Sequence, residues 1–424
     1  MGLSIDFESR YNKPAVPLVL FDFATQEAEV AANHGMPGLR IQFFRGPAWG
    51  KTREQIRRVM VEGNNPITGK PVMPELVAKL TTPLTDEEKK TGDLKRDNGP
   101  ATFTDTHDNL QKMFREKRWT DFLPVILPTE EKVEDMLKGT SHLPEEVLGK
   151  IAPNTAFEAW TYTVRTAAIN AVMAGCEREY LPLILAVGST SMEGINVSDS
   201  GWVSALVING KIRDEIGLNY GIGAMGPYAL ANTTIGRAWN LLSINGGNCG
   251  KVGTTYMGTV GNPMNLINIV IAENENESPF EPFSTRLGKG YKRGQNIVSL
   301  FNGWGVLSAK NWKFDDWGSP VANGWRGPKD LNYPQIIKDI CNDQDTMFGA
   351  CAVLSPPIAN FVKDAGYNTI EKFTQWLMTP PEGQQPHFRS PSQISVIVTG
   401  GTNNNYFSMG ALRFNSSVEI DPWR

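Results

Sequence analysis

Apolar stretches alternate with short polar stretches over most of this chain, and the spacing changes from one region to the next. Residues 16–21 and 38–44 are apolar runs, whereas residues 25–34 and 51–62 have the spacing of amphipathic helices. Short strands separated by a helix are typical of a parallel sheet. The pattern therefore predicts a partial Rossmann-like βαβ segment over residues 1–63.

The pattern weakens between residues 64 and 123, where Gly, Pro and charged residues are mixed. We interpret this region as an arm or insertion that contacts a partner. Regular patterning returns at residue 124 and continues to residue 424. This stretch predicts one large mixed α/β domain, so the fold class is α/β or α+β.

Helical and strand-like segments follow each other along the large domain. Thr129 is a good N-cap for the first helix, and Gly175 is expected to end the second. The third helix should start at Asn232, Thr233 or Thr234. The Gly- and Trp-rich segment 297–325 predicts irregular structure. The expected helices are 130–138, 156–174, 235–242, 357–365 and 370–377, and the expected strands are 202–208, 350–354 and 392–399.

Composition narrows the classes of function. Lys and Arg number 41 against 45 Asp and Glu, for a net charge of -4 without long runs of either sign, which argues against a nucleic-acid partner. The apolar runs fall far short of the roughly 18 to 20 residues that cross a bilayer. The 4 cysteines are scattered and form no CxxC pair. We therefore expect a cytoplasmic protein with reduced thiols and no membrane contact.

One candidate substrate-binding segment runs from Asn219 to Arg237. It is rich in glycine and asparagine, and Asn232, Thr234 and Arg237 lie near an expected helix start. An N-cap residue and an Arg one turn later can hold a carboxylate or phosphate. Ordinary capping with a structural Arg explains these residues nearly as well.

A second candidate segment is the turn that follows the strand 392–399. Gly400, Gly401 and Asn403 can present backbone N–H groups and an amide to a small polar substrate. The spacing matches neither GxGxxG nor a phosphate-binding loop, so there is no nucleotide motif. A plain tight turn is the alternative.

The third candidate segment follows the apolar run 266–272. Glu273, Glu275 and Glu277 alternate with Asn, so they share one face if the strand continues. Glu273 and Glu275 are then candidates for acid–base catalysis or for binding a divalent metal, whose identity stays open. A solvated acidic loop is the alternative.

Cys176 and His142 are the remaining catalytic candidates. Cys176 lies beside Arg178, but it follows a helix end, where the helix dipole disfavours a thiolate. A packed or ligand-lining residue is the alternative for this cysteine. His142 lies in a loop with hydroxyl neighbours that can set its tautomer.

Several motifs together resemble the UGSC-motif (seleno)protein family and the long domain that accompanies it. The resemblance covers residues 124–424, and residues 16–60 also resemble the second half of the UGSC-type domain. The motifs are Pro128–Glu134 with Gly139-Thr140, Asn170–Cys176, Asn209-Gly210, Ala231–Arg237, Ala272-Glu273 through Ser278-Pro279, and Val398–Gly401. The family implies thiol-linked chemistry on a small molecule.

The chain departs from that family in lacking the Cys- or Sec-Gly-Ser-Cys motif. Either a second subunit supplies the redox Cys or Sec and docks on the N-terminal segment, or the protein works without it. The leading hypothesis is the large subunit of an oligomeric, heteromeric enzyme that performs redox or addition–elimination chemistry on a small polar molecule. One alternative is a metal-dependent lyase, hydratase or hydrolase that uses the Glu273 loop. Another is a non-catalytic assembly subunit, with 64–119 and the Trp-rich 301–325 as interfaces.

Overall fold

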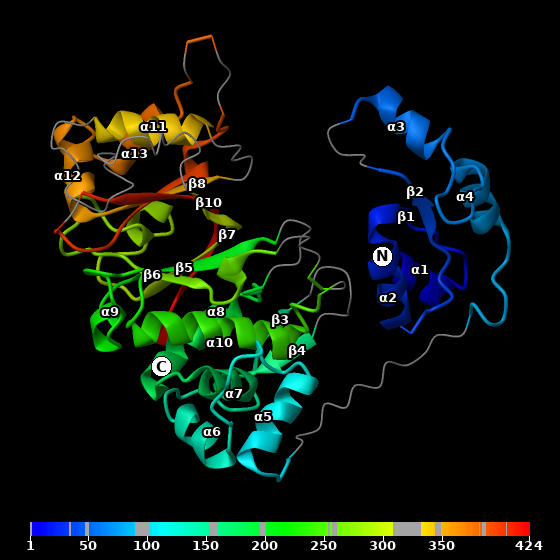
Figure 1. Ribbon diagram of the computed structural model, residues 1–424, viewed down its shortest axis with the longest axis horizontal. Helices are drawn as coiled ribbons and strands as arrows, with labels where there is room; N and C mark the ends of the chain where they lie inside the picture. Colours follow the sequence, from blue (N-terminus) through cyan, green and yellow to red (C-terminus); the bar gives the residue numbers. More distant parts are fainter. Residues whose placement is uncertain are drawn as a thin grey trace. The chain divides into compact units, whose positions relative to one another are not determined.

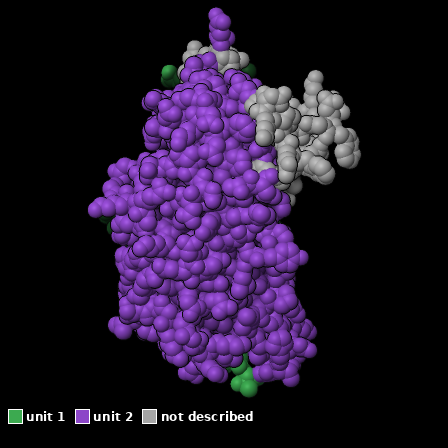
Figure 2. All heavy atoms as spheres, turned by 90° about the vertical axis from the view of Figure 1, so that its left-hand side faces the viewer, with its two compact units in different colours: residues 1–104, 152–160, 248–257 green, residues 105–151, 161–247, 258–424 purple. Residues whose placement is uncertain are grey.

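The chain divides into two compact units (Figure 2). Unit 1 comprises residues 1–104, 152–160 and 248–257, and unit 2 comprises residues 105–151, 161–247 and 258–424. The computed structural model describes residues 2–33, 35–46, 51–89, 102–151, 160–195, 201–252, 255–256, 261–307, 332–343, 349–380, 382–383, 387–403 and 405–424.

Unit 1 contains the expected βαβ segment. Strands β1 (Leu18–Leu20) and β2 (Gln42–Phe44) pair in parallel, and helix α2 (Ala24–Asn33) lies between them in the sequence. Three further helices belong to this unit: α1 (Gly2–Tyr11), α3 (Arg53–Met60) and α4 (Val72–Thr81). Helices α1 and α4 were not expected.

Unit 2 starts at Asp105, earlier than the expected residue 124. Helix α5 (His107–Glu116) belongs to it because the side chain of Gln111 bonds to both the N–H and the carbonyl of Val125. Helix α6 (Glu130–Leu137) follows, and the Thr129 hydroxyl accepts from Lys132 N, which confirms the predicted cap.

The expected helix 156–174 is wrong at its start. Residues 152–159 lie outside the described part of the chain, and Trp160–Thr163 forms strand β4, which pairs with β3 (Val147–Ile151). Helix α7 (Val164–Ala174) begins only after Thr163, which forms a capping box with Thr166. Gly175 ends α7 with φ of 86°, as predicted.

Helix α8 (Leu181–Ser189) is buried along almost its whole length.

A curled six-stranded mixed sheet forms the centre of unit 2 (Figure 1). Its order is β6-β5-β7-β10-β8-β9. The pairs β5–β6 and β8–β9 are parallel, and the other neighbours are antiparallel. The strands are β5 (Val203–Asn209), β6 (Ile269–Ala272), β7 (Ile297–Leu307), β8 (Ala350–Leu354), β9 (Ile394–Val398) and β10 (Phe407–Glu419). The mixed α/β class is therefore confirmed.

The sheet consists of two halves with the same topology. In each half a parallel pair joined through helices is followed by a longer antiparallel strand, and these long strands, β7 and β10, pair at the centre. Helices α9 (Ile212–Glu215) and α10 (Leu230–Gly247) connect the parallel pair of the first half, and α12 (Pro356–Asp364) and α13 (Ile370–Leu377) that of the second. The sequence shows no repeat, so this duplication of topology is visible only in the structure.

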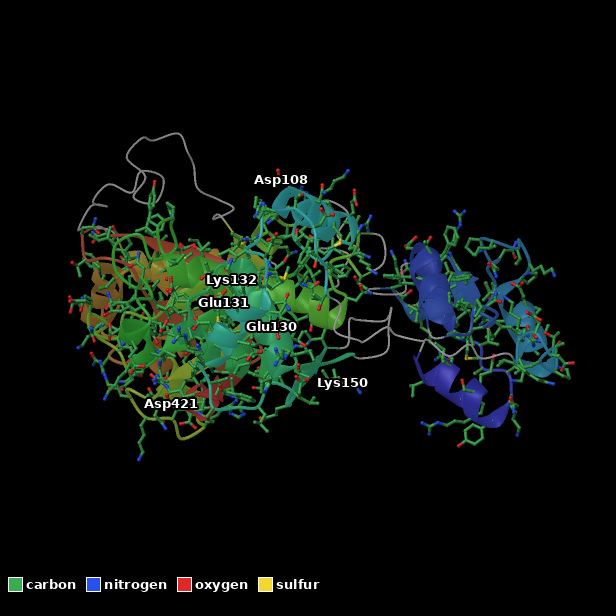
Figure 3. All side chains as sticks on the ribbon, turned by 90° about the horizontal axis from the view of Figure 1, so that it is seen from below. Asp108, Glu130, Glu131, Lys132, Lys150 and Asp421 are labelled. Carbon is green, nitrogen blue, oxygen red and sulfur yellow. The ribbon has the colours of Figure 1, made fainter. Side chains whose placement is uncertain are left out.

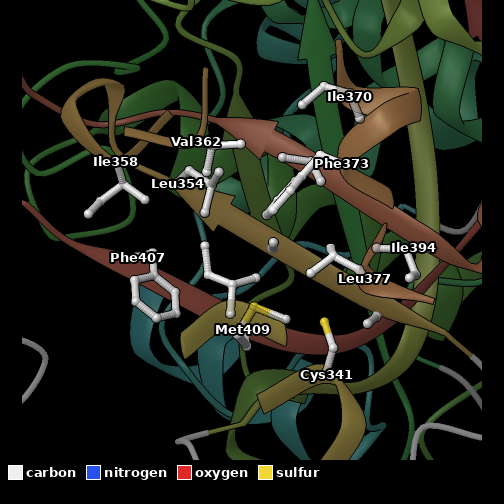
Figure 4. Packing of buried hydrophobic residues seen from close by; sticks show 14 of the residues in the cluster. Cys341, Leu354, Ile358, Val362, Ile370, Phe373, Leu377, Ile394, Phe407 and Met409 are labelled. Atoms are coloured by element: carbon white, nitrogen blue, oxygen red, sulfur yellow. The ribbon is translucent and has the colours of Figure 1, made fainter. Parts of the chain in front are cut away.

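Two hydrophobic cores fix the curvature of the sheet. One includes residues from all six strands, among them Val207, Ile271, Phe301, Val353 and Leu412. The other packs β8, β9 and β10 against α11 (Tyr333–Asp343), α12 and α13 (Figure 4). Because both cores are apolar, the polar positions at the strand ends are not needed for hydrophobic packing.

One long strand corrects the expectation of irregular structure near residue 300. Residues 297–307 form β7, which pairs with β5 and β10, while the rest of the Trp-rich segment, 308–325, lies outside the described residues. Gly303 allows one irregularity, because a Cβ there would lie 2.0 Å from Ala411 O. Among the described helices, none combines the length and apolar character that a bilayer crossing requires.

Candidate functional site

The ends of β6 and β9 meet in what we call the strand-end junction, residues 272–275 and 398–401. The backbone N–H of Asn274 donates to Val398 O at 2.7 Å, and the Thr399 hydroxyl donates to Ala272 O at 2.7 Å. Each strand thus caps a carbonyl of the other, although the two strands lie at opposite edges of the sheet order. The junction brings together residues that are more than a hundred positions apart in the sequence.

The candidate segment from Asn219 to Arg237 reaches the same junction. Gly400 N donates to Tyr220 O at 2.9 Å, and a Cβ on Gly401 would lie 2.4 Å from the Ile222 side chain. Asn232 closes the base of this loop, because its amide oxygen accepts from Asn219 N at 2.9 Å. The three segments therefore converge, as the site hypothesis requires.

Glu273 is the most buried carboxyl group of the junction. Its Oε2 accepts from Asn209 Nδ2 at 2.6 Å and from Phe283 N at 2.7 Å. Its Oε1 has no hydrogen-bond partner among the described residues, and the nearest charge is Arg286, 3.9 Å away. The Asn209 amide oxygen is likewise without a partner within the described part. A buried polar atom without a hydrogen-bond partner lowers the stability of the folded state. The two unpartnered oxygens are therefore not explained by folding alone.

Burial raises the pKa of Glu273 above its ordinary value, although Arg286 and the bond from Asn209 act in the opposite direction. Burial also lowers the pKa of the Arg286 guanidinium, against the effect of Glu273. Arg286 is held by the carbonyls of Val396 and Glu281. Glu273 therefore keeps its proton to higher pH than an exposed glutamate does.

Glu275 is buried as well, but its Oε1 already has several partners. Its Oε1 accepts from Gly210 N at 2.7 Å and lies 3.5 Å from Arg213 Nε. Strand β6 ends at Ala272, so the condition under which the three glutamates would share one face is not met, and Glu277 lies exposed in the turn. Glu275 thus acts as an anchor for Arg213 rather than as a second free carboxylate.

The metal hypothesis gains no support from side-chain geometry. Across the described ranges, no three His, Cys, Asp or Glu side chains form a group that could hold a metal ion. Glu273 and Glu275 share Asn209 as a donor, and their remaining contacts are with Arg side chains and backbone N–H groups.

Thr234, Arg237 and Cys176 form a separate cluster. Helix α10 begins at Leu230, so the start expected between 232 and 234 is wrong, and the Thr234 hydroxyl donates to Leu230 O within the helix. Arg237 makes a two-pronged ion pair with Asp121 at 2.8 and 2.9 Å. It is therefore engaged by a carboxylate of this chain.

The cysteines are poor nucleophiles in this structure. Part of Cys176 is accessible to solvent, yet burial of its thiol raises its pKa to about 12, despite Thr234 and Arg237 nearby. Burial likewise raises the pKa of Cys341 and of Cys351 to about 12. Because the thiolate is the reactive form, these thiols are inert near neutral pH.

His142 and Asn403 complete the candidates. His142 bonds to Glu146 and to Pro422 O, and its ring stacks on Trp423, so its partners are outside the junction. Asn403 is exposed beside Gly401, since a Cβ on that glycine would lie 2.8 Å from Asn403 Oδ1.

Several residues in or beside the junction were not among the predicted site residues. Asn209 and Thr399 each directly follow the last core residue of a strand. Ligand sites in α/β sheets gather at the carboxyl ends of strands. The position of these two residues was therefore a signal that the sequence offered. Arg213 and Arg286 carried no local signal, because their meeting with Glu275 and Glu273 depends on the curl of the sheet. The resemblance to the UGSC-motif family stays a prediction, because no family model matches the chain and no curated protein or solved structure matches it either.

Proposed function

We propose that this chain is the large subunit of an enzyme that acts on a small polar molecule at the strand-end junction, with Glu273 as the acid or base. The observation that carries the proposal is the Oε1 of Glu273, which is buried and lacks a hydrogen-bond partner among the described residues. A carboxyl group with a raised pKa in such a place can transfer a proton near neutral pH. The unpartnered amide oxygen of Asn209 suits a substrate that carries N–H or O–H donors.

Glu273 is fully buried, and we propose that substrate reaches it when the loop 219–229, which contacts Gly400 at the junction, moves away. The base of this loop is fixed by Asn219 and Asn232, whereas its tip exposes Ile222 and Tyr228 to solvent. A loop with a fixed base and an exposed tip can open as a flap over the junction. Gly400 and Gly401 then offer backbone groups, and Asn403 an amide, to the entering molecule.

Thiol-linked chemistry, which the family resemblance implies, needs a thiol other than those of Cys176, Cys341 and Cys351. Cys176, Cys341 and Cys351 have pKa values raised to about 12, so they are not the nucleophile in our proposal. A second subunit that docks on this chain would supply a reactive Cys or Sec. A metal-dependent reaction at the Glu273 loop lacks a third ligand in the described portion of the chain.

The decisive experiment compares two glutamates of the same turn. Wild type, Glu273→Gln and Glu277→Gln are incubated with a small-molecule extract from the protein's host, and changes are followed by mass spectrometry. We expect wild type and Glu277→Gln to consume the same compound, because Glu277 is exposed. Glu273→Gln should be slower by roughly 100-fold or more, as for the loss of an acid–base group. Equal activity of all three proteins would disprove the role of Glu273.

A second measurement tests the partner. Native mass spectrometry of the protein isolated from its host should show a smaller chain with an alkylation-sensitive Cys or Sec. A homo-oligomer with inert cysteines that still consumes substrate would disprove the thiol-linked part and leave Glu273 as the catalytic group. A stable complex without any turnover would favour the assembly-subunit alternative.

A further inference from the structure

His142 clamps the segment 420–424, which includes the short 3-10 helix η6 (Asp421–Trp423). Its Nε2 lies 2.8 Å from Pro422 O, its Nδ1 lies 2.9 Å from Glu146 Oε2, and its ring stacks on Trp423 with centroids 4.7 Å apart. Thr140 and Ser141 add bonds to Trp423 O and Arg424 O. One short loop thus holds the whole segment.

Both ring nitrogens of His142 face groups that can only accept hydrogen bonds. The Pro422 carbonyl has no proton to donate, and an ionised Glu146 carboxylate has none either. A neutral imidazole carries a single N–H, so it satisfies one of these acceptors and leaves a lone pair facing the other. The geometry therefore favours the doubly protonated imidazolium, which can donate to both acceptors.

The other charged groups around the clamp are already paired. Arg424 bonds to Asp421 and to Glu215, and the exposed Asp421 (Figure 3) also accepts from Asn296. On the neighbouring helices and loops, Lys138 and Arg178 pair with Asp135, and Arg165 pairs with Glu134 and Glu145. Glu146 is thus the one charge in direct contact with the His142 ring among the described residues.

The clamped segment is connected to the strand-end junction through helix α9. Asn296 Nδ2 donates to Asp421 Oδ1 at 2.7 Å, and Asn296 Oδ1 accepts from Ile212 N at 2.8 Å. The next residue, Arg213, donates to Gly210 O and Glu273 O and lies beside Glu275. Arg424 bonds to Glu215 at the other end of α9. The segment therefore holds both ends of the helix that carries Arg213.

We propose that His142 is a pH-sensitive latch: as imidazolium it holds residues 420–424 against α9, and its deprotonation releases this segment and loosens Arg213 at the junction. Loss of the proton removes the hydrogen bond from His142 to the carbonyl of Pro422. It also removes the positive charge that pairs with Glu146. Control of catalysis through Arg213 rests on the proposed function, whereas release of the segment does not.

The direction of the pH effect follows from the contacts. The Pro422 carbonyl and then Glu146 raise the pKa of His142 above its ordinary value. Stabilisation of the segment is therefore complete below about pH 6.5, the pKa of an unfolded histidine. It is lost as the pH rises through the folded-state pKa. The latch is closed in acid and open in base.

The test is fluorine NMR of the full chain labelled with 5-fluorotryptophan, with the Trp423 resonance assigned by Trp423→Phe. We expect this resonance to show one transition above pH 6.5, as the stacked ring is released. The transition should vanish in His142→Gln and remain in His107→Gln, since His107 is exposed and contacts only Asp108 in the described structure. Glu146→Gln should move its midpoint down by roughly 0.5 to 1 pH unit.

Two results would overturn the inference in different ways. A Trp423 resonance without a pH transition, or a transition that persists in His142→Gln, would disprove the latch. Amide hydrogen exchange, corrected for its intrinsic pH dependence, should also become several-fold faster as the pH rises. This increase should occur in residues 212–216 together with 420–424. Exchange confined to 420–424 would keep the latch and disprove its coupling to Arg213, whether or not Glu273 proves catalytic.

Discussion

The two halves of the sheet differ in the side chain that ends their second strand. Glu273 N donates to Ile208 O at 3.0 Å, and Thr399 N donates to Leu354 O at 2.9 Å, so the two residues are structural equivalents. The Thr399 hydroxyl is used fully in capping Ala272 O, whereas one oxygen of Glu273 is left without a partner in the described structure. A threonine is therefore sufficient for this fold position, and the carboxyl group of the first half exceeds what the fold needs.

The residues that end the first strand of each half show the same contrast. Ser355 Oγ accepts from Tyr406 N, which joins neighbouring backbone segments. Asn209, at the matching position, instead donates to both Glu273 and Glu275. In the second half, the side chains at the strand ends form hydrogen bonds to backbone groups. In the first half, the strand ends carry a cluster of buried ionisable groups. The difference directs the search for chemistry to the first half.

The largest effect should come from removing the carboxyl group of the first half. Glu273→Leu leaves Phe283 N without its acceptor and the buried Arg286 without the carboxylate that pairs with its charge, so we expect a loss of roughly 3 to 5 kcal/mol in the free energy of unfolding. Thr399→Val removes one hydrogen bond and should cost about 1 kcal/mol. Urea denaturation of both variants measures the contrast. Equal losses would show that both halves use their strand ends in the same way.

A smaller effect concerns the glycine that follows Asn209. Gly210 has φ of 95°, and a Cβ there would lie 2.2 Å from Gln295 O. Gly217 has φ of 67° with nothing within 4 Å of its Cβ position. We expect Gly217→Ala to cost about 1 to 2 kcal/mol for its left-handed backbone, and Gly210→Ala roughly 2 kcal/mol more for the clash. Matching urea midpoints would show that Gln295 can move away freely.

The sequence predicted the parts of this fold whose signal is local. The buried strands β5, β8 and β9 are continuous apolar runs, and helix α6 begins at a threonine cap. Strands β7 and β10 were missed, because glycines and polar residues interrupt them and their stability comes from pairing with distant strands. The sequence singled out the three candidate loops but left open whether they meet, and Arg213 and Arg286 join them only through the curl of the sheet.

The smallest expected effect is a difference in pH dependence between the two halves. The pKa of Glu273 is raised by burial, so the folded state binds its proton more tightly than the unfolded chain does. The stabilisation is therefore complete below the ordinary glutamate pKa of about 4.3, and it is lost as the pH rises through the folded-state pKa. The loss has an upper limit of about 1.4 kcal/mol per pH unit within that window.

Urea titrations between pH 4 and 8 can isolate this contribution. Glu273→Gln mimics the protonated carboxyl group and cannot titrate. As the pH rises through the window, the wild type should therefore lose free energy of unfolding relative to Glu273→Gln. Thr399→Val alters the other half, where the equivalent residue carries no titratable group, and should keep the wild-type slope. Parallel curves for wild type and Glu273→Gln would mean that Glu273 titrates like an exposed glutamate. The carboxyl group would then lack the raised pKa that distinguishes it from Thr399 as a proton donor.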